Sequence, residues 1–236
     1  MRDILINNAK LMGIDMSPEQ ADMFCSYHSL LTEANKTMNL TRVPDDVEEA
    51  VARNYLDSVT PLIYGLPEGT RSLADVGSGA GFPGIPLAIM LPDVRITLID
   101  ALDKRVKFLN DVIKALGLNA RAVHFRCEDA GKRPELRESF DIVTSRAVAA
   151  LNILAELSLP LVRVGGQMIA YKGPIWQEEA AQAANALEKL GGSIREAKPA
   201  DIPGRDWNHM LVYIDKVSET PAQYPRRPGM PEKKPL

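Results

Sequence analysis

Residues 72–86 read Ser-Leu-Ala-Asp-Val-Gly-Ser-Gly-Ala-Gly-Phe-Pro-Gly-Ile-Pro, and this stretch decides the fold. A short apolar run ends at Asp75 and Val76, glycines alternate at positions 77, 79 and 81, and an apolar segment then resumes. This order predicts a strand, a glycine-rich turn and a helix. Alternating glycines let the backbone bend sharply and let a flat or charged ligand approach the main chain. We therefore expect a nucleotide-type binding turn that presents unpaired N–H groups at a helix N-terminus.

Two binding motifs overlap in this turn. Residues 79–84 satisfy the G-x-G-x-x-G pattern of dinucleotide-binding folds. Residues 75–81 satisfy D-x-G-x-G-x-G, which resembles motif I of S-adenosylmethionine (SAM) methyltransferases. In a dinucleotide fold the turn glycine, Gly79, would follow the strand two residues late, so the spacing favours SAM. An NAD-dependent dehydrogenase remains the alternative.

Strand and helix patterns alternate after this turn. We expect strands at 71–76, 94–99, 122–127, 140–144 and 167–171, and helices from about 83 and at 103–116, 150–158 and 176–190. The runs at 194–199 and 210–216 are separated by a loop alone and predict an antiparallel hairpin. This is an α/β pattern with a doubly wound, Rossmann-like sheet. The closing hairpin is typical of a class I SAM-dependent methyltransferase.

The flanking segments differ from this core. Residues 1–66 predict an N-terminal helical extension, with a helix start at Ser17-Pro18-Glu19-Gln20 and a second helix at about 45–64. Residues 67–217 form the expected SAM-binding domain. Residues 218–236 are a basic, proline-rich tail packed on or beside it, and their prolines predict an extended arm without helix.

Composition restricts the class of protein. The net charge of −3 over 236 residues gives no overall attraction to nucleic acid, so an RNA site must be a local basic patch. The separate cysteines Cys25 and Cys127 predict reduced thiols and a cytoplasmic protein. We expect no signal peptide, no membrane span and no metal site. The scattered histidines, His28, His124 and His209, are expected to be structural or at the surface.

Polar residues at the predicted strand ends mark the cleft, because open α/β sheets bind ligands there. Asp100 ends the second strand and is placed to accept both ribose hydroxyls, with a helix N-cap as the alternative. Cys127 and Glu128 end the third strand, where an adenine would lie. Arg146 and Lys172 end the fourth and fifth strands beside the cleft. An arginine there can pair with a carboxylate or a phosphate.

Basic residues form two candidate RNA contacts. Cations are unfavourable at a helix N-terminus, so Lys104 and Arg105 are plausible polyanion contacts. The tail carries further basic residues, and we expect it to contact RNA or to strap the domain, with a solvated terminus as the alternative. These residues are Arg226, Arg227, Lys233 and Lys234.

Taken together, these segments resemble the bacterial 16S ribosomal RNA guanine-N7 methyltransferase family (RsmG, formerly GidB). The matching segments are Met38–Thr41, Arg53 with Leu56–Ser58, Asp75–Gly84, Leu98–Asp100 with Lys104–Arg105, Ser145–Ala147, Tyr171–Gly173 and Tyr224–Leu236. One departure is Asn54, where the family often has histidine.

The resemblance implies methyl transfer from SAM to a guanine N7 of 16S ribosomal RNA in the small ribosomal subunit. N7 carries a lone pair and no proton, so we expect alignment without a general base. Arg146 and Lys172 would position the reactants, and the chain would act as a monomer. Cofactor contacts are expected from Asp75, Gly77, Gly79, Gly81, Phe82, Asp100, Cys127, Glu128 and Arg146, and RNA contacts from Lys104, Arg105, Lys172, Arg226, Arg227, Lys233 and Lys234. A class I methyltransferase with another substrate and a SAM-binding RNA-association factor without turnover remain alternatives.

Overall fold

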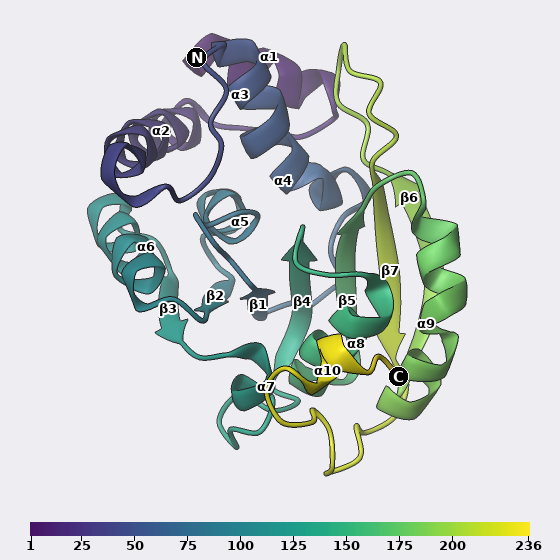
Figure 1. Cartoon of the computed structure of the whole chain (residues 1–236). Coiled ribbons are helices and arrows are strands. Elements are labelled where there is room, and N and C mark those ends of the chain that lie inside the picture. The colour runs from purple at the N-terminus through teal and green to yellow at the C-terminus, as the bar shows by residue number, and fades with distance from the viewer.

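Seven strands form one sheet in the order β3-β2-β1-β4-β5-β7-β6, and the computed structural model describes all of residues 1–236 (Figure 1). Neighbours from β3 to β5 pair in parallel, whereas β7 pairs antiparallel with both β5 and β6. The strands are β1 (Ser72–Val76), β2 (Arg95–Asp100), β3 (Ala120–His124), β4 (Phe140–Arg146), β5 (Val162–Lys172), β6 (Gly192–Pro199) and β7 (Met210–Lys216). The predicted doubly wound sheet with a closing hairpin is confirmed.

The strand order places the ligand site. The chain winds outward from β1 through β2 to β3 and then returns to β4 on the other side of β1. Ligands of open α/β sheets bind at such a reversal, beyond the carboxyl ends of the strands. The glycine-rich turn after β1, Asp100 at the end of β2 and Arg146 at the end of β4 therefore belong to one edge of the sheet.

Helices cover both faces of the sheet (Figure 1). They are α1 (Arg2–Leu11), α2 (Pro18–Met38), α3 (Val47–Ala50), α4 (Asp57–Val59), α5 (Gly84–Met90), α6 (Asp103–Leu116), α7 (Cys127–Ala130), α8 (Leu151–Ser158), α9 (Trp176–Leu190) and α10 (Met230–Lys233). A π-helical segment (Val51–Leu56) joins α3 to α4, and short 3-10 segments follow at Thr60–Tyr64 and Leu159–Leu161. None of the helices combines the length and the apolar character needed to cross a lipid bilayer.

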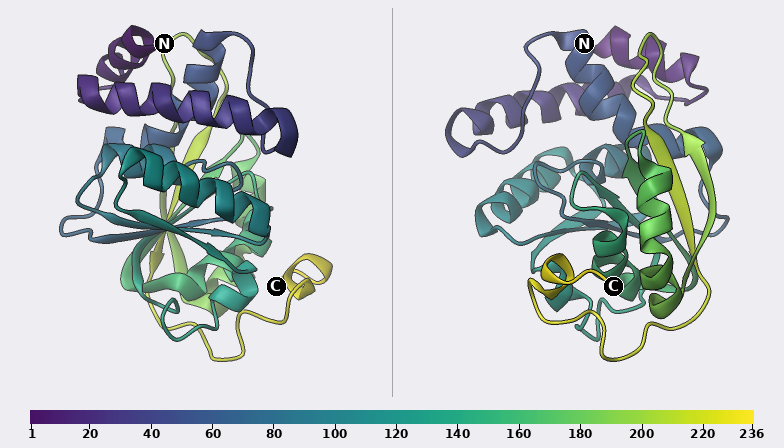
Figure 2. Two further views of the ribbon diagram at one scale, coloured as in Figure 1. Left: turned by 90° about the vertical axis from the view of Figure 1, so that its left-hand side faces the viewer. Right: turned by 45° about the vertical axis from the view of Figure 1, so that its right-hand side comes forward.

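The N-terminal helices share a core with the main domain. Ser17 caps α2 through the predicted capping box with Gln20. Buried side chains of α2, such as Phe24 and Leu31, belong to the same apolar cluster as Leu98 of β2 and Leu109 of α6. Figure 2 shows α2 lying across α6 at the end of the molecule that carries the N-terminus. Residues 1–66 are therefore packed into the fold and do not form a separate lobe.

Two expectations about local structure were wrong. The third strand ends at His124, and Cys127 begins the short helix α7 instead of ending the strand. The tail was expected to lack helix, but Met230–Lys233 forms one turn, with Pro231 near its start, where a missing N–H is harmless. The tail leaves β7, crosses the end of the molecule opposite the N-terminal helices and ends beside α8 (Figures 1 and 2).

Candidate cofactor and substrate cavities

The glycine-rich loop is held by its own hydrogen bonds. The N–H groups of Gly77 and Ser78 donate to the carbonyl of Ile99, and those of Gly81 and Phe82 donate to the carbonyl of Ser78. The N–H groups of Gly79 and Gly84 donate to the side chains of Asp100 and Asp75. The prediction that this turn presents unpaired N–H groups at a helix N-terminus was therefore wrong for these six residues.

Asp75 holds the glycine-rich loop in place through hydrogen bonds to its carboxylate. Its buried carboxylate accepts from the Gly84 N–H at 3.1 Å and from the Thr144 hydroxyl at 3.3 Å. Burial raises the pKa of Asp75 to about 6. The residue therefore orients the loop and does not line a cavity.

Position 81 must be glycine because a side chain there would collide with Tyr27 of the N-terminal extension. A Cβ at this position would lie 2.7 Å from the Tyr27 hydroxyl, and the backbone φ is +112°. Tyr27 reaches the loop to donate a 2.7 Å hydrogen bond to the carbonyl of Ala80. Phe82 packs against Tyr27 and Tyr55, so it lies in an aromatic cluster behind the loop and not in the cavity beside it.

A cavity of about 340 Å³ opens in front of the loop. It is lined by Gly77, Asp100, Ala101, Leu102, Arg105, Arg126, Cys127, Glu128, Ala147, Val148, Leu157, Gly229, Pro231 and Glu232. We call it the cofactor cavity. Four of the predicted cofactor residues, Gly77, Asp100, Cys127 and Glu128, line it, whereas Asp75, Gly79, Gly81, Phe82 and Arg146 do not.

Asp100 is one of three carboxylates that line the cofactor cavity, with Glu128 and Glu232, and it is almost fully buried. Its Oδ2 accepts from the Gly79 N–H at 2.8 Å, and its Oδ1 accepts from the Leu102 N–H at 2.9 Å. It therefore holds the loop and the start of α6 as well as facing the cavity. Burial raises the pKa of the Cys127 thiol to about 12, so this thiol stays protonated and is no nucleophile.

The donor pattern of the cofactor cavity separates SAM from a dinucleotide. A pyrophosphate needs free backbone N–H groups at the glycine-rich turn. Here the N–H groups of Gly77, Ser78 and Gly79 are already used, so the turn offers no free donors to a diphosphate. The cavity is lined by the carboxylates of Asp100, Glu128 and Glu232, and Asp100 at the end of β2 is placed to accept the hydroxyls of a ribose. At Gly77 a Cβ would lie 2.5 Å from Val148, so the wall admits no side chain.

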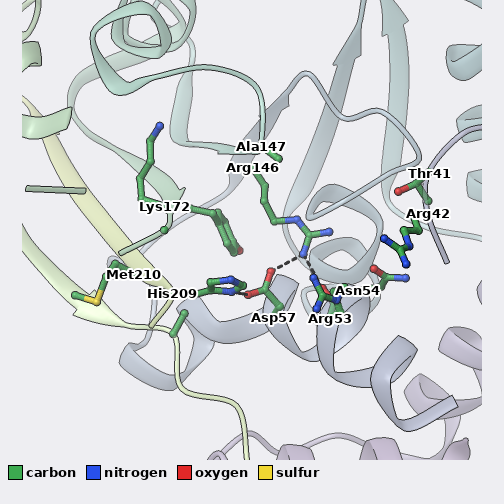
Figure 3. A pocket seen from close by; sticks show the side chains of 13 residues that line it. Thr41, Arg42, Arg53, Asn54, Asp57, Arg146, Ala147, Lys172, His209 and Met210 are labelled. Atoms are coloured by element: carbon green, nitrogen blue, oxygen red, sulfur yellow. Dashed lines mark hydrogen bonds and ion pairs between the residues drawn. The ribbon is translucent and has the colours of Figure 1, made fainter. Parts of the chain in front are cut away.

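A second cavity, also of about 340 Å³, shares the lining residue Ala147 with the first, and Figure 3 shows the side chains that line it. Thr41, Arg42, Arg53, Asn54, Asp57, Arg146, Ala147, Tyr171, Lys172, Gly173, Ala200, His209 and Met210 line it. We call it the substrate cavity. Ala147 lines both cavities, in the left-handed backbone conformation with a φ of +57°. The two sites therefore meet at the end of β4.

Arg146 is fixed on the floor of the substrate cavity. Its Nη1 donates to Asp57 Oδ2 at 2.6 Å and to the carbonyl of Arg53 at 3.2 Å, and its guanidinium lies over the Phe82 ring (Figure 3). His209 Nδ1 lies 3.0 Å from the other oxygen of Asp57. Burial alone would raise the pKa of Asp57, but His209 and Arg146 hold the pKa of this carboxyl below its usual value.

Lys172, which was expected beside the cleft, lines this cavity. Its side chain is 6% exposed, and its Nζ donates to Glu179 Oε2 at 2.6 Å and to the carbonyl of Ala149 at 2.7 Å. His209 was expected to be structural or at the surface, but it lines the cavity through its contact with Asp57. No sequence motif joins residues so far apart, so only the fold reveals the pair.

Only some of the residues predicted to contact RNA are exposed in the structure. Arg226 is held by Glu156, whose side chain is 1% exposed, so the predicted RNA contact of Arg226 is not retained. Arg105 lines the cofactor cavity, 3.6 Å from Asp100, instead of facing outward. The remaining candidates are exposed; these are Lys104, Arg227, Lys233 and Lys234.

The sheet order, the self-bonded glycine loop and the cavity around Asp100 define a class I SAM-dependent methyltransferase. Solved structures with the same fold include an O-methyltransferase from Bacillus cereus in complex with SAH (TM-score 0.56, 16% identity, 81% of this chain and 91% of that chain). The cofactor-bound Rv0187 from MTB is also similar (TM-score 0.57, 15% identity, 84% of this chain and 91% of that chain).

Comparison with sequence relatives identifies the family within this class of enzymes. The profile of the GidB family, rRNA small subunit methyltransferase G, matches residues 20–201. The ribosomal RNA small subunit methyltransferase G of Lactobacillus johnsonii is 44% identical over 227 residues, which cover 95% of each chain. That of Clostridium beijerinckii is 44% identical over 235 residues, 99% of this chain and 98% of the relative. This chain belongs to the rRNA small subunit methyltransferase G family, which uses SAM as its methyl donor.

Proposed function

We propose that this enzyme transfers the methyl group of SAM to N7 of a guanine in 16S ribosomal RNA of the small ribosomal subunit. The observation that carries the proposal is the meeting of the two cavities at Ala147. One cavity fits a nucleoside cofactor, and the other is lined by Arg42, Arg53 and Arg146. A cation-lined cavity suits an RNA nucleotide, because guanidinium groups pair with phosphates and stack on bases.

The chemistry of the substrate cavity agrees with a target that has no proton to lose. When bound, SAM supplies an electrophilic methyl group on a sulfonium. Guanine N7 has a free lone pair, so the protein must align the reactants and need not remove a proton. The carboxylate of Asp57 accepts from Arg146 and contacts His209, which leaves it committed to holding these side chains. The cavity therefore contains a rigid polar floor in place of a free general base.

Arg146 and Lys172 are the proposed positioning residues. The Arg146 guanidinium has five N–H donors, and the structure uses one nitrogen for Asp57 and the carbonyl of Arg53. The Lys172 ammonium has three N–H donors, of which Glu179 and the carbonyl of Ala149 take two. Arg146 therefore retains donors for a nucleotide while its own position is fixed, whereas the Lys172 ammonium points away from Arg146, toward Glu179 (Figure 3).

Exposed cations outside the cavity complete the proposed RNA contact. Lys104, Arg227, Lys233 and Lys234 are exposed and would neutralise phosphates around the target base. A base inside a helix is inaccessible, so the guanine must be unstacked before it enters the cavity. Because one chain lines both cavities, we also propose that a monomer suffices and that the enzyme acts in the cytoplasm, where its ribosomal substrate is made.

Labelled SAM and small subunits that lack the modification test the proposal. We expect label on a single guanine, located by strand cleavage after chemical reduction, because N7 methylation makes the base labile. Label on another base or on protein would refute the proposed target.

A further inference from the structure

The C-terminal tail is fastened to the main domain before it reaches the cofactor cavity. Arg137, which follows α7, donates to the carbonyls of Thr220 at 2.6 Å and Tyr224 at 2.8 Å. The guanidinium of Arg226 then contacts both carboxylate oxygens of Glu156, at 2.9 and 2.6 Å. Arg137 holds the tail by backbone carbonyls, and Glu156 holds it by the side chain and the N–H of Arg226, so the residues that follow have a defined position.

A third anchor lies in the cofactor cavity itself. The Gly229 N–H donates to Glu128 Oε1 at 2.9 Å, and Glu128 lines the cavity. Gly229 has a φ of +79°, a conformation that side chains rarely adopt, so the turn at this point depends on glycine. The chain then places Pro231 and Glu232 on the same cavity as Asp100.

We propose that Gly229–Glu232 is part of the SAM-binding site and forms its outer wall. The tail uses one acceptor position of the Glu128 carboxylate, which has about four. The remaining positions are available to the amino group of the adenine. Glu128 would then bind both the tail and the cofactor. Cofactor binding would therefore stabilise the position of the tail, and the tail would stabilise the bound cofactor. The proposal rests on SAM as cofactor and is independent of the RNA target.

A plain structural strap would behave differently. A strap stabilises the fold through Arg137 and Arg226 and has no contact with the cofactor. Changes at its far end would then lower the melting temperature without changing cofactor affinity. If the tail is a wall, changes at its far end should also weaken cofactor binding, because the bound nucleoside contacts it.

The test uses the full-length variant Gly229→Val. A Cβ at position 229 has no atom within 4 Å, so the substitution disturbs the backbone turn without a direct clash. Gly69→Val is the matched control, because Gly69 also has a positive φ, of +77°, and open space around it, but lies in the loop before β1. We expect both variants to lose a similar amount of thermal stability. Only Gly229→Val should weaken SAH binding, by about tenfold or more in calorimetry.

Hydrogen exchange of the unmodified protein gives a second measurement that needs no variant. Saturating SAH should slow exchange of the amides of residues 226–236, and of the Gly229 N–H by about tenfold. Equal SAH affinity in Gly229→Val and Gly69→Val would overturn the proposal. If Gly229→Val does not fold, unchanged exchange of the tail on SAH binding would overturn it. Neither measurement involves RNA, so a failure of the proposed target would leave this result intact.

Discussion

Replacing Arg226 by glutamine removes the cation that pairs with a buried carboxylate. The Glu156 side chain is 1% exposed and that of Arg226 is 23% exposed. Removing one partner of a buried ion pair costs about 3–5 kcal/mol, because the other charge stays buried and unpaired. The backbone N–H of residue 226 would still donate to Glu156, at 2.7 Å in the parent. We therefore expect a loss near the lower end, about 3 kcal/mol of the free energy of unfolding.

Urea denaturation at neutral pH measures this loss, and a double-mutant cycle with Glu156→Gln isolates the pair. The double variant should be more stable than the sum of the two single losses predicts, by about 1 kcal/mol or more. Arg227→Gln is the control, because Arg227 is the neighbouring residue and is exposed. It should change stability by less than about 0.5 kcal/mol.

RNA binding should depend on Arg227 and not on Arg226, which is the reverse of their expected effects on stability. Arg227→Gln should reduce the slope of log affinity against log salt by roughly 0.7–0.9, the contribution of one phosphate contact. Arg226→Gln, measured where the variant is folded, should leave that slope unchanged. The reasoning fails if Arg226→Gln is as stable as the parent, or if it loses the salt slope as Arg227→Gln does.

Four further predictions concern the two cavities. Asp100→Ala should weaken SAM binding by about 1–3 kcal/mol in calorimetry, through the lost ribose acceptor and the freed Gly79 N–H, and unchanged affinity would refute the assignment. The pKa of Asp75, about 6 when folded and about 3.9 when unfolded, means that the folded state binds more protons between these values, so stability falls as pH rises from about 4 to about 6 and then levels off. Melting curves of Asp75→Asn over this range should lack that slope, and a persisting slope would assign it to another group. Single-turnover methyl transfer should be nearly flat between about pH 6.5 and 8.5, since N7 needs no base. A tenfold change per pH unit there, abolished in His209→Gln, would show that His209 acts as a base. Finally, Asn54 Nδ2 is buried without a hydrogen-bond partner, so Asn54→Leu should raise the free energy of unfolding by about 1 kcal/mol while slowing methyl transfer; a less stable variant would count against this.

The sheet was predictable because its signals are local. Apolar runs, capping residues and Gly191 define elements over a few residues each, and α6 and α9 begin and end where the sequence places them. The closing hairpin also follows from local pattern, since only a loop separates its strands. The end of the third strand was misplaced because residues 125–127 are compatible with either a strand or the turn into α7.

The substrate cavity was only partly predictable because it is assembled from distant segments. Arg146 and Lys172 were found from their places at strand ends, a rule of topology. Asp57 and His209 are separated by 152 positions in the sequence, and no pattern in either segment predicts their contact. Likewise, Arg226 looks like a surface cation in a basic tail, and its partner Glu156 looks like an ordinary helix residue of α8. Burial of the pair depends on the path of the whole tail.

The position of the tail also matters for the order in which the protein is made. Domains fold from the N-terminus as the chain is synthesised, and the N-terminal helices and the sheet have all left the ribosome before the tail. Yet Gly229, Pro231 and Glu232, which are translated after every strand of the sheet, line the cofactor cavity. A nascent chain therefore has its loop and its Asp100 carboxylate in place while the cavity still lacks one side. A chain that stops at Pro228 would have an intact sheet and an open cavity, a defect that abundance and solubility would not reveal.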